Sequence, residues 1–137
     1  MDAQELKRKL DAAHYVYDDS LVTTLLVALQ LGRPLLIEGA AGVGKTEIAK
    51  VMAQALDREL VRLQCYEGLD ESKALYEWNY QKQLLSIQVQ MNRQDPEELT
   101  RSLFSDEYLL ERPLLKSIRS EKPVVLLIDE IDKADEE

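Results

Sequence analysis

One eight-residue motif constrains this chain more than any other feature of its sequence. Gly39-Ala-Ala-Gly42-Val-Gly44-Lys45-Thr46 satisfies the pattern G-x-x-x-x-G-K-[ST] at every position. A short apolar run, Pro34–Ile37, precedes it and predicts a buried parallel strand. The helix expected after it has apolar residues at core-facing spacing: Ile48, Val51, Met52, Ala55 and Leu56. A strand, a glycine-rich loop and a helix in this order predict a loop that holds phosphate groups.

Each residue type in the motif has a physical task in phosphate binding. The glycines let backbone N–H groups converge on phosphate oxygens, and the helix opening at Lys45 adds the positive end of its dipole. We expect the Lys45 ammonium to reach the β- and γ-phosphates, and the Thr46 hydroxyl to bind Mg²⁺. The alternative is a glycine-rich turn without a ligand. The residues predicted to contact ATP in this region are Gly39, Ala40, Ala41, Gly42, Val43, Gly44, Lys45, Thr46 and Glu47.

A second motif lies near the end of the sequence, where the apolar run Val124–Ile128 leads into Asp129-Glu130. Acids are useful at this point because ligands of open α/β sheets bind at the carboxyl ends of the strands. Asp129 is predicted to hold Mg²⁺, directly or through a water, and Glu130 to act as the base that polarises the attacking water. By itself the pattern also fits a solvated strand end; the upstream phosphate motif favours the catalytic interpretation.

The remaining pattern predicts an α/β fold with a parallel sheet. Helices are expected over Asp2–Ala13 and over Leu21–Leu31, the second capped by Asp18-Asp19-Ser20 and stopped by Gly32. Leu60–Leu63 is a further strand candidate. The middle, Tyr66–Lys122, is polar and mostly helical in pattern. Within it Asp95 is expected to cap a helix that begins with Pro96, with Glu98 completing a capping box, and Pro113 is expected to begin another helix.

Composition narrows the class of protein. The 137 residues suit one domain, and a net charge of −9 argues against a general binder of nucleic acid or anionic membranes. The longest apolar runs, Leu25–Leu29 and Val124–Ile128, are far shorter than the roughly 20 residues of a membrane span. Cys65 has no partner for a disulfide, which favours a reducing cytoplasm, and it is expected to be inert.

The motifs lie within strings that resemble a known family. LLIEGAAGVGKTEIAK, VRLQCYEGLD, ALYEWNYQKQLLSI, LLERPLL and LLIDEIDKADEE together resemble the MoxR family of AAA+ ATPases, closest to its CoxD-like branch. The resemblance implies a P-loop NTPase fold of three α/β/α layers and an ATPase that remodels a client protein. It also implies a homo-hexamer, a von Willebrand A-domain partner, and a role in maturing a molybdenum-containing carbon monoxide dehydrogenase.

The resemblance adds two weaker expectations about single residues. Tyr15 stands where family members place residues near the adenine, although a tyrosine there is also often structural. Tyr76, Trp78 and Tyr80 fall in a region that tends to face the central pore of the ring and could contact a client. The alternative is simple packing, with Tyr76 and Tyr80 on one face of a helix.

The comparison also identifies what is missing. The sequence ends after the Walker B acids Asp129-Glu130, before the polar sensor, arginine finger and lid, so we expect a truncated N-terminal part of the module. The predicted divisions are N-terminal helices over 1–33, a phosphate-loop unit over 34–64, a helical insert over 65–122, and the Walker B strand and tail over 123–137. The missing elements leave open a module that binds ATP without hydrolysing it; a small-molecule kinase is disfavoured.

Overall fold

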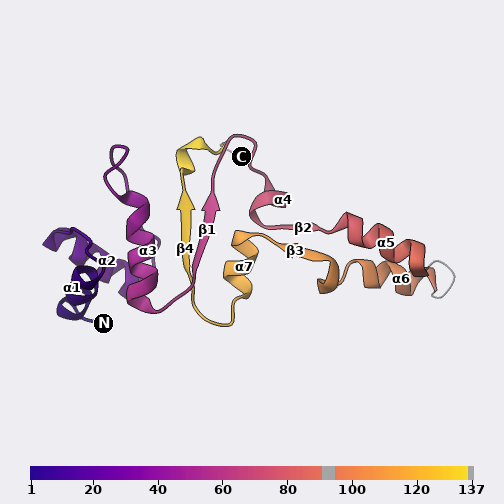
Figure 1. Cartoon of the computed structure of the whole chain (residues 1–137), viewed down its shortest axis with the longest axis horizontal. Coiled ribbons are helices and arrows are strands. Elements are labelled where there is room, and N and C mark those ends of the chain that lie inside the picture. The colour runs from indigo at the N-terminus through magenta and orange to yellow at the C-terminus, as the bar shows by residue number, and fades with distance from the viewer. Residues whose placement is uncertain (91–94, 136–137) are drawn as a thin grey trace. The chain divides into compact units, whose positions relative to one another are not determined.

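The structure, a computed structural model, describes residues 1–90 and 95–135 of the chain (Figure 1). These residues divide into two compact units. The first unit comprises Met1–Val61 and Lys122–Leu127, and the second comprises Arg62–Glu121 and the residues from Ile128 onward. Parts of two predicted divisions, 91–94 in the insert and 136–137 in the tail, lie outside the described residues.

Three helices make up most of the first unit: α1 (Ala3–Ala12), α2 (Asp19–Leu31) and α3 (Lys45–Leu56). The helix predicted over Asp2–Ala13 is confirmed as α1, and the predicted start and stop signals are confirmed at α2. The Asp2 carboxylate accepts a hydrogen bond from the Glu5 N–H at 2.8 Å, and the Asp18 carboxylate accepts one from the Leu21 N–H at 2.7 Å. Gly32 ends α2 in the left-handed conformation, with φ of 60°.

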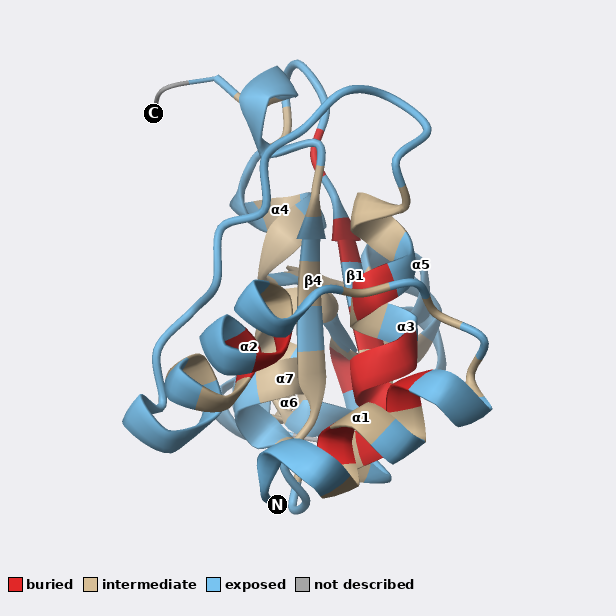
Figure 2. Cartoon of the chain, turned by 90° about the vertical axis from the view of Figure 1, so that its left-hand side faces the viewer, coloured by how far each residue is buried: buried red, intermediate tan, exposed pale blue. Residues whose placement is uncertain are grey.

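The apolar core of the first unit lies among these three helices. Figure 2 shows buried segments on α1, α2 and α3. The core-facing positions predicted on α3 are confirmed, with Leu56 at the margin of the cluster. The Lys9 ammonium also donates to the carbonyl of Ala55 at 2.5 Å, near the end of α3. The core cluster consists of Leu6, Leu10, Val22, Leu25, Ile48, Val51, Met52 and Ala55.

The predicted parallel pairing is confirmed in a two-stranded sheet formed by β1 (Leu60–Gln64) and β4 (Val125–Asp129). Both strands run in the same direction, as Figure 1 shows. Two backbone hydrogen bonds of 2.9 Å flank the pairing, from the Val125 N–H to the Glu59 carbonyl and from the Cys65 N–H to the Asp129 carbonyl. The chain is thus a mixed α/β fold with a parallel pair of strands.

The prediction of a strand at Pro34–Ile37 is wrong. These four residues form no regular secondary structure and are all exposed. An apolar run becomes a strand only where a neighbouring strand satisfies its backbone N–H and C=O groups. Among the described residues the parallel sheet contains β1 and β4 only, so the run has no such neighbour.

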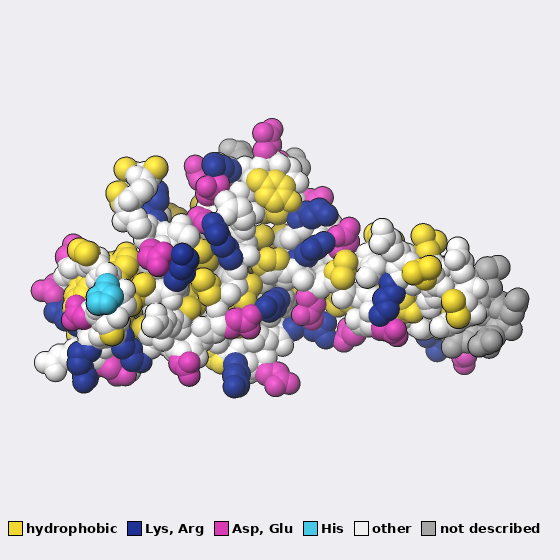
Figure 3. All heavy atoms as spheres, in the orientation of Figure 1, with side chains coloured by type: hydrophobic (Ala, Val, Ile, Leu, Met, Phe, Trp, Pro, Cys, Tyr) yellow, Lys and Arg dark blue, Asp and Glu magenta, His cyan; other side chains and the backbone are white. Residues whose placement is uncertain are grey.

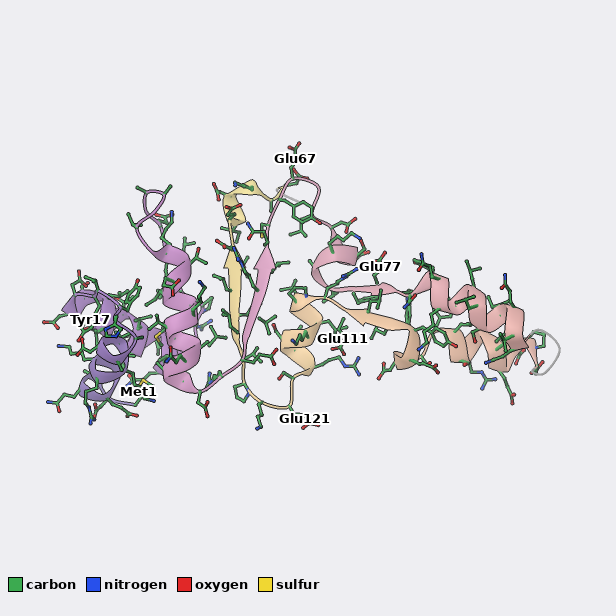
Figure 4. The ribbon with its side chains drawn as sticks, viewed as in Figure 1. Met1, Tyr17, Glu67, Glu77, Glu111 and Glu121 are labelled. Atoms are coloured by element: carbon green, nitrogen blue, oxygen red, sulfur yellow. The ribbon has the colours of Figure 1, made fainter. Side chains whose placement is uncertain are left out.

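The second unit is less helical than its sequence predicts. It contains an antiparallel pair formed by β2 (Tyr76–Trp78) and β3 (Leu109–Glu111), with Glu77 opposite Leu110. Figure 4 labels Glu77 and Glu111 on these two strands. Strands of three residues are too short to show an alternating pattern, which explains why they escaped prediction. The other elements of this unit are α4 (Glu71–Ala74), α5 (Tyr80–Gln90), α6 (Pro96–Leu103), η1 (Asp106–Tyr108), α7 (Pro113–Arg119) and η2 (Ile131–Lys133).

Two local predictions in the second unit need correction. Tyr76 lies in β2 and Tyr80 begins α5, so they do not share a helical face. Trp78 instead packs edge-on against Tyr76 and Phe104, with ring centroids 6.1 and 5.2 Å apart. Asp95 does precede α6, but its side chain makes no capping hydrogen bond. The capping box with Glu98 is therefore wrong.

Candidate functional site

The phosphate motif forms a loop whose backbone requires glycine at two positions. Gly42 has φ of 81° and Gly44 has φ of 88°, in the left-handed region that side chains disfavour. Gly39 is restricted by space instead, because an added Cβ would lie 3.2 Å from the Cγ2 atom of Val43. The local sequence therefore dictates the sharp course of the loop.

The loop leads directly into α3, whose N-terminus is suited to an anion. Gly44 is the N-cap residue and has no side chain to accept a hydrogen bond from the first turn. Among the described residues no side chain caps this end of α3. The first-turn N–H groups and the helix dipole therefore favour a negatively charged group at the loop.

The two predicted side chains at the start of α3 lie within this loop region. The Lys45 ammonium donates to the carbonyl of Gly39, so the side chain reaches back across the loop. Lys45 and Thr46 are both half-buried, whereas residues 39–43 are exposed. The exposed loop backbone, the ammonium and the hydroxyl thus belong to one continuous stretch of chain.

Glu47, in the first turn of α3, and Tyr15 are the other residues predicted near the nucleotide. Burial raises the pKa of the Tyr15 phenol, and the negative charge of Glu47 raises it further. Tyr15 is half-buried and packs against the core cluster. Glu47 is exposed on α3 and pairs with Lys50 at 2.9 Å. Tyr15 is therefore near enough to Glu47 to be affected by its charge.

The second predicted motif lies in the second unit, where β4 ends. The Asp129 side chain is 15% exposed and accepts a hydrogen bond from the Nη2 atom of Arg62 on β1. The same guanidinium nitrogen donates to the Oε1 atom of Gln64 at 2.7 Å. Because the Asp129 carbonyl also accepts from the Cys65 N–H, β1 and the residue that follows it hold both the side chain and the backbone of Asp129.

Glu130 follows in an unusual conformation. Its φ of 54° and ψ of 44° are left-handed, which is uncommon for a residue with a side chain. The exposed carboxylate pairs with the Lys133 ammonium at 2.7 Å across the turn of η2. This hydrogen bond raises the pKa of Lys133.

Sequence reasoning missed the basic partners of both acids. Lys133 could have been found, because it stands three residues after Glu130 in a stretch that turns. Arg62 gave no local signal, since its position beside Asp129 depends on the pairing of two strands far apart in sequence. Cys65 is buried, and burial followed by the charge of Asp129 raises the pKa of its thiol, which suits an inert cysteine.

The predicted magnesium ligands have suitable chemistry. Thr46 offers a hydroxyl oxygen and Asp129 a carboxylate, and oxygen is the donor that Mg²⁺ prefers. Thr46 belongs to the first unit and Asp129 to the second. Within residues 1–90 and 95–135, no group of three or more His, Cys, Asp and Glu side chains converges as a metal site.

Comparisons with known proteins agree with the phosphate motif. The family described as AAA domain (dynein-related subfamily) matches residues 34–137. A Lon protease from Clostridium beijerinckii is 38% identical over 81 residues, which cover 53% of this chain and 10% of the protease. The match thus spans about a tenth of that relative's length.

No solved structure matches the chain significantly. In the part of the chain that the structure describes, every helix is too short or too polar to cross a membrane. The family match covers the phosphate loop, α3, both parallel strands and the acids at the end of β4. The chain belongs to the AAA domain family, in its dynein-related subfamily.

Proposed function

We propose that the chain binds ATP with Mg²⁺ through Gly39–Thr46, and that the protein of which it forms the ATPase module hydrolyses the nucleotide. One observation carries the binding proposal. Gly42 and Gly44 turn the backbone through left-handed conformations directly before the uncapped end of α3, with Lys45 as the first residue of that helix. Membership of the AAA domain family supports the same conclusion, since such domains generally bind ATP with Mg²⁺.

Each residue has a defined part in this proposal. The N–H groups of the loop and the Lys45 ammonium hold the phosphates by charge-assisted hydrogen bonds, for which Lys45 leaves the carbonyl of Gly39. Thr46 and Asp129 are the proposed Mg²⁺ ligands, and bound Mg²⁺ would neutralise charge on the phosphates. Glu130 takes a proton from the attacking water, for which its carboxylate leaves Lys133. Tyr15 is the proposed contact of the adenine, and Glu47, in the first turn of α3, belongs to the proposed ATP-binding stretch.

The assignment to a family within the AAA domain proteins rests on sequence strings alone. YEGLD and ALYEWNY support assignment to the MoxR family and its CoxD-like branch. On that basis we propose a cytoplasmic ATPase that assembles as a homo-hexamer with a von Willebrand A-domain partner. Its client would be a molybdenum-containing carbon monoxide dehydrogenase during maturation. Detecting the hexamer by analytical ultracentrifugation of the whole protein with ATP tests this part separately.

Replacing the lysine of the loop tests the binding proposal. Lys45→Ala removes charge-assisted contacts worth roughly 1.5–3 kcal/mol each, so ATP affinity should fall by about ten- to a hundredfold in calorimetric titrations. Lys50→Ala is the matched control, because Lys50 lies on the same helix but pairs with Glu47 on its surface. Equal affinity of the native chain and the Lys45→Ala variant would refute the assignment.

A module that binds ATP without turnover is the second candidate. The ion pairs of Asp129 with Arg62 and of Glu130 with Lys133 favour it, because both acids are engaged by cations. Phosphate release by the whole protein separates the candidates. Under the hydrolysis proposal Glu130→Gln keeps ATP binding but lowers turnover by about 10²–10⁴-fold, the usual loss for a general base. Asp132→Asn, on the same turn, should leave turnover unchanged; no turnover in the native protein would favour the second candidate.

A further inference from the structure

Arg62 is the functional candidate that the predicted ATP site does not include. Along β1 the side chains alternate, with Val61 and Leu63 buried and Arg62 and Gln64 on the exposed face. The Arg62 side chain remains 50% exposed, and exposed ion pairs add little to stability. Its contact with Asp129 therefore needs an explanation other than holding the sheet together.

The geometry of the contact is that of a brace on the carboxylate. The Nη2 atom of Arg62 carries two hydrogens, and it donates to Gln64 on its own strand and to Asp129 on the neighbouring strand. The guanidinium is planar and rigid, so being held at Gln64 restricts where it can present its second hydrogen. Meanwhile the Cys65 N–H fixes the backbone of Asp129 at 2.9 Å. The carboxylate is thus restricted through its main chain and through its side chain.

We propose that Arg62 is a positioning residue that orients the Asp129 carboxylate for Mg²⁺, and that Gln64 supports Arg62 in turn. The proposal rests on the assignment of Asp129 as a magnesium ligand made above. Carboxylates that bind metals are themselves commonly held by hydrogen bonds, and loss of such an outer partner typically costs about 10–100-fold in metal affinity or activity. Arg62 acts through Asp129 and does not touch the nucleotide.

The test measures how much Mg²⁺ the chain needs to bind ATP tightly. Calorimetric titrations of the native chain with ATP are run in EDTA and at rising Mg²⁺. We expect Arg62→Ala to bind ATP normally in EDTA but to need about ten- to a hundredfold more Mg²⁺ for half of the gain in affinity. Arg62→Lys should recover part of the loss, since it keeps the charge but lacks the rigid, planar guanidinium. Arg58→Ala, an exposed arginine outside this network, is the matched control and should behave as native.

A double-mutant cycle shows whether Arg62 acts through Asp129. Asp129→Asn alone should raise the Mg²⁺ requirement, and adding Arg62→Ala to it should change the requirement no further. Binding of Mn²⁺ in the presence of ATP, followed by electron paramagnetic resonance, gives the same comparison without any turnover. Circular dichroism of each variant checks its folding, and Arg62→Gln replaces Arg62→Ala if the alanine variant is unfolded.

The outcomes separate this inference from the proposed function. If Asp129→Asn raises the Mg²⁺ requirement but Arg62→Ala and Arg62→Gln do not, the positioning role is refuted and the magnesium ligand stands. If loss of Arg62 lowers the Mg²⁺ concentration needed for tight ATP binding, Arg62 competes with the metal for Asp129. The positioning role is then also refuted. If Asp129→Asn itself has no effect, the assignment of Asp129 fails, and this inference fails with it.

Discussion

Different interactions stabilise the interiors of the two units of this chain. In the first unit, eight apolar residues from three helices form one buried cluster. In the second unit, ion pairs and side-chain hydrogen bonds connect neighbouring segments: Arg112 with Glu77, Arg119 with Asp106 and Glu111, Lys82 with Glu107, and Tyr108 with Ser86. Figure 3 shows basic and acidic side chains beside one another on the face it presents. Apolar burial is non-directional and is not screened by salt, whereas surface ion pairs are weak and screened.

The difference predicts where the chain opens first. A segment with few buried apolar contacts opens at low free-energy cost, while a packed core opens only near global unfolding. The first unit contains the phosphate loop, which leads into α3. This unit should therefore stay ordered under conditions in which the second unit opens. Three changes test this difference, each aimed at one kind of contact.

The largest effect is expected in the apolar cluster. Leu10 is fully buried, so Leu10→Ala removes its transfer free energy and leaves a cavity, at a cost of about 2–5 kcal/mol in the free energy of unfolding. Urea unfolding followed by circular dichroism measures the loss. Leu85→Ala on α5 is the control: this leucine is 63% exposed, and its removal should change the free energy by less than about 0.5 kcal/mol. Equal losses would mean that the core cluster is not what stabilises the first unit.

A smaller loss is expected from the buried amide of the second unit. Gln83 is 7% exposed, and its Nε2 atom donates to the carbonyl of Leu103. Gln83→Leu leaves that carbonyl without its partner, which should cost about 1–3 kcal/mol. Hydrogen exchange should show faster opening of α5 and α6 and no change in α3. Gln81→Leu, at an exposed position of the same helix, should leave exchange unchanged, and protection lost equally in α3 would contradict the division.

The smallest effect is expected on acidification. The hydrogen bond from Arg112, followed by the charge of Lys73, lowers the pKa of Glu77 below its ordinary value of 4.5. A carboxyl with a lowered folded-state pKa stabilises the fold above its ordinary pKa, and this contribution is lost as the pH falls through the lowered value. After correction for the intrinsic pH dependence of exchange, the protection of amides in β2 and β3 should thus fall below about pH 4.5. Glu77→Gln should weaken this dependence and Glu98→Gln should not; an unchanged profile in Glu77→Gln would exclude the pair as its source.

Local sequence was enough to predict the structure wherever the conformation depends on residues close together in the chain. The Asp18 cap, the stop at Gly32 and the loop before α3 follow from the conformations that single residues favour. The errors fall where distant segments decide the outcome. Pro34–Ile37 has the composition of a strand without a pairing partner, and β2 is a strand because β3, about thirty residues later, supplies the partner. The same holds for the candidate site. The phosphate loop could be predicted from local sequence, whereas the partner of Asp129 depends on strand pairing and could not.

The left-handed backbone at Glu130 has a consequence for how this position can evolve. Glycine adopts that conformation without steric penalty, so stability alone favours glycine at residue 130. The chain carries glutamate there instead, and tolerates a residue that the local backbone disfavours. If Glu130 is the base, selection for rate keeps an acid where selection for stability would remove it. Drift toward glycine at residue 130 would then mark descendants that have given up hydrolysis.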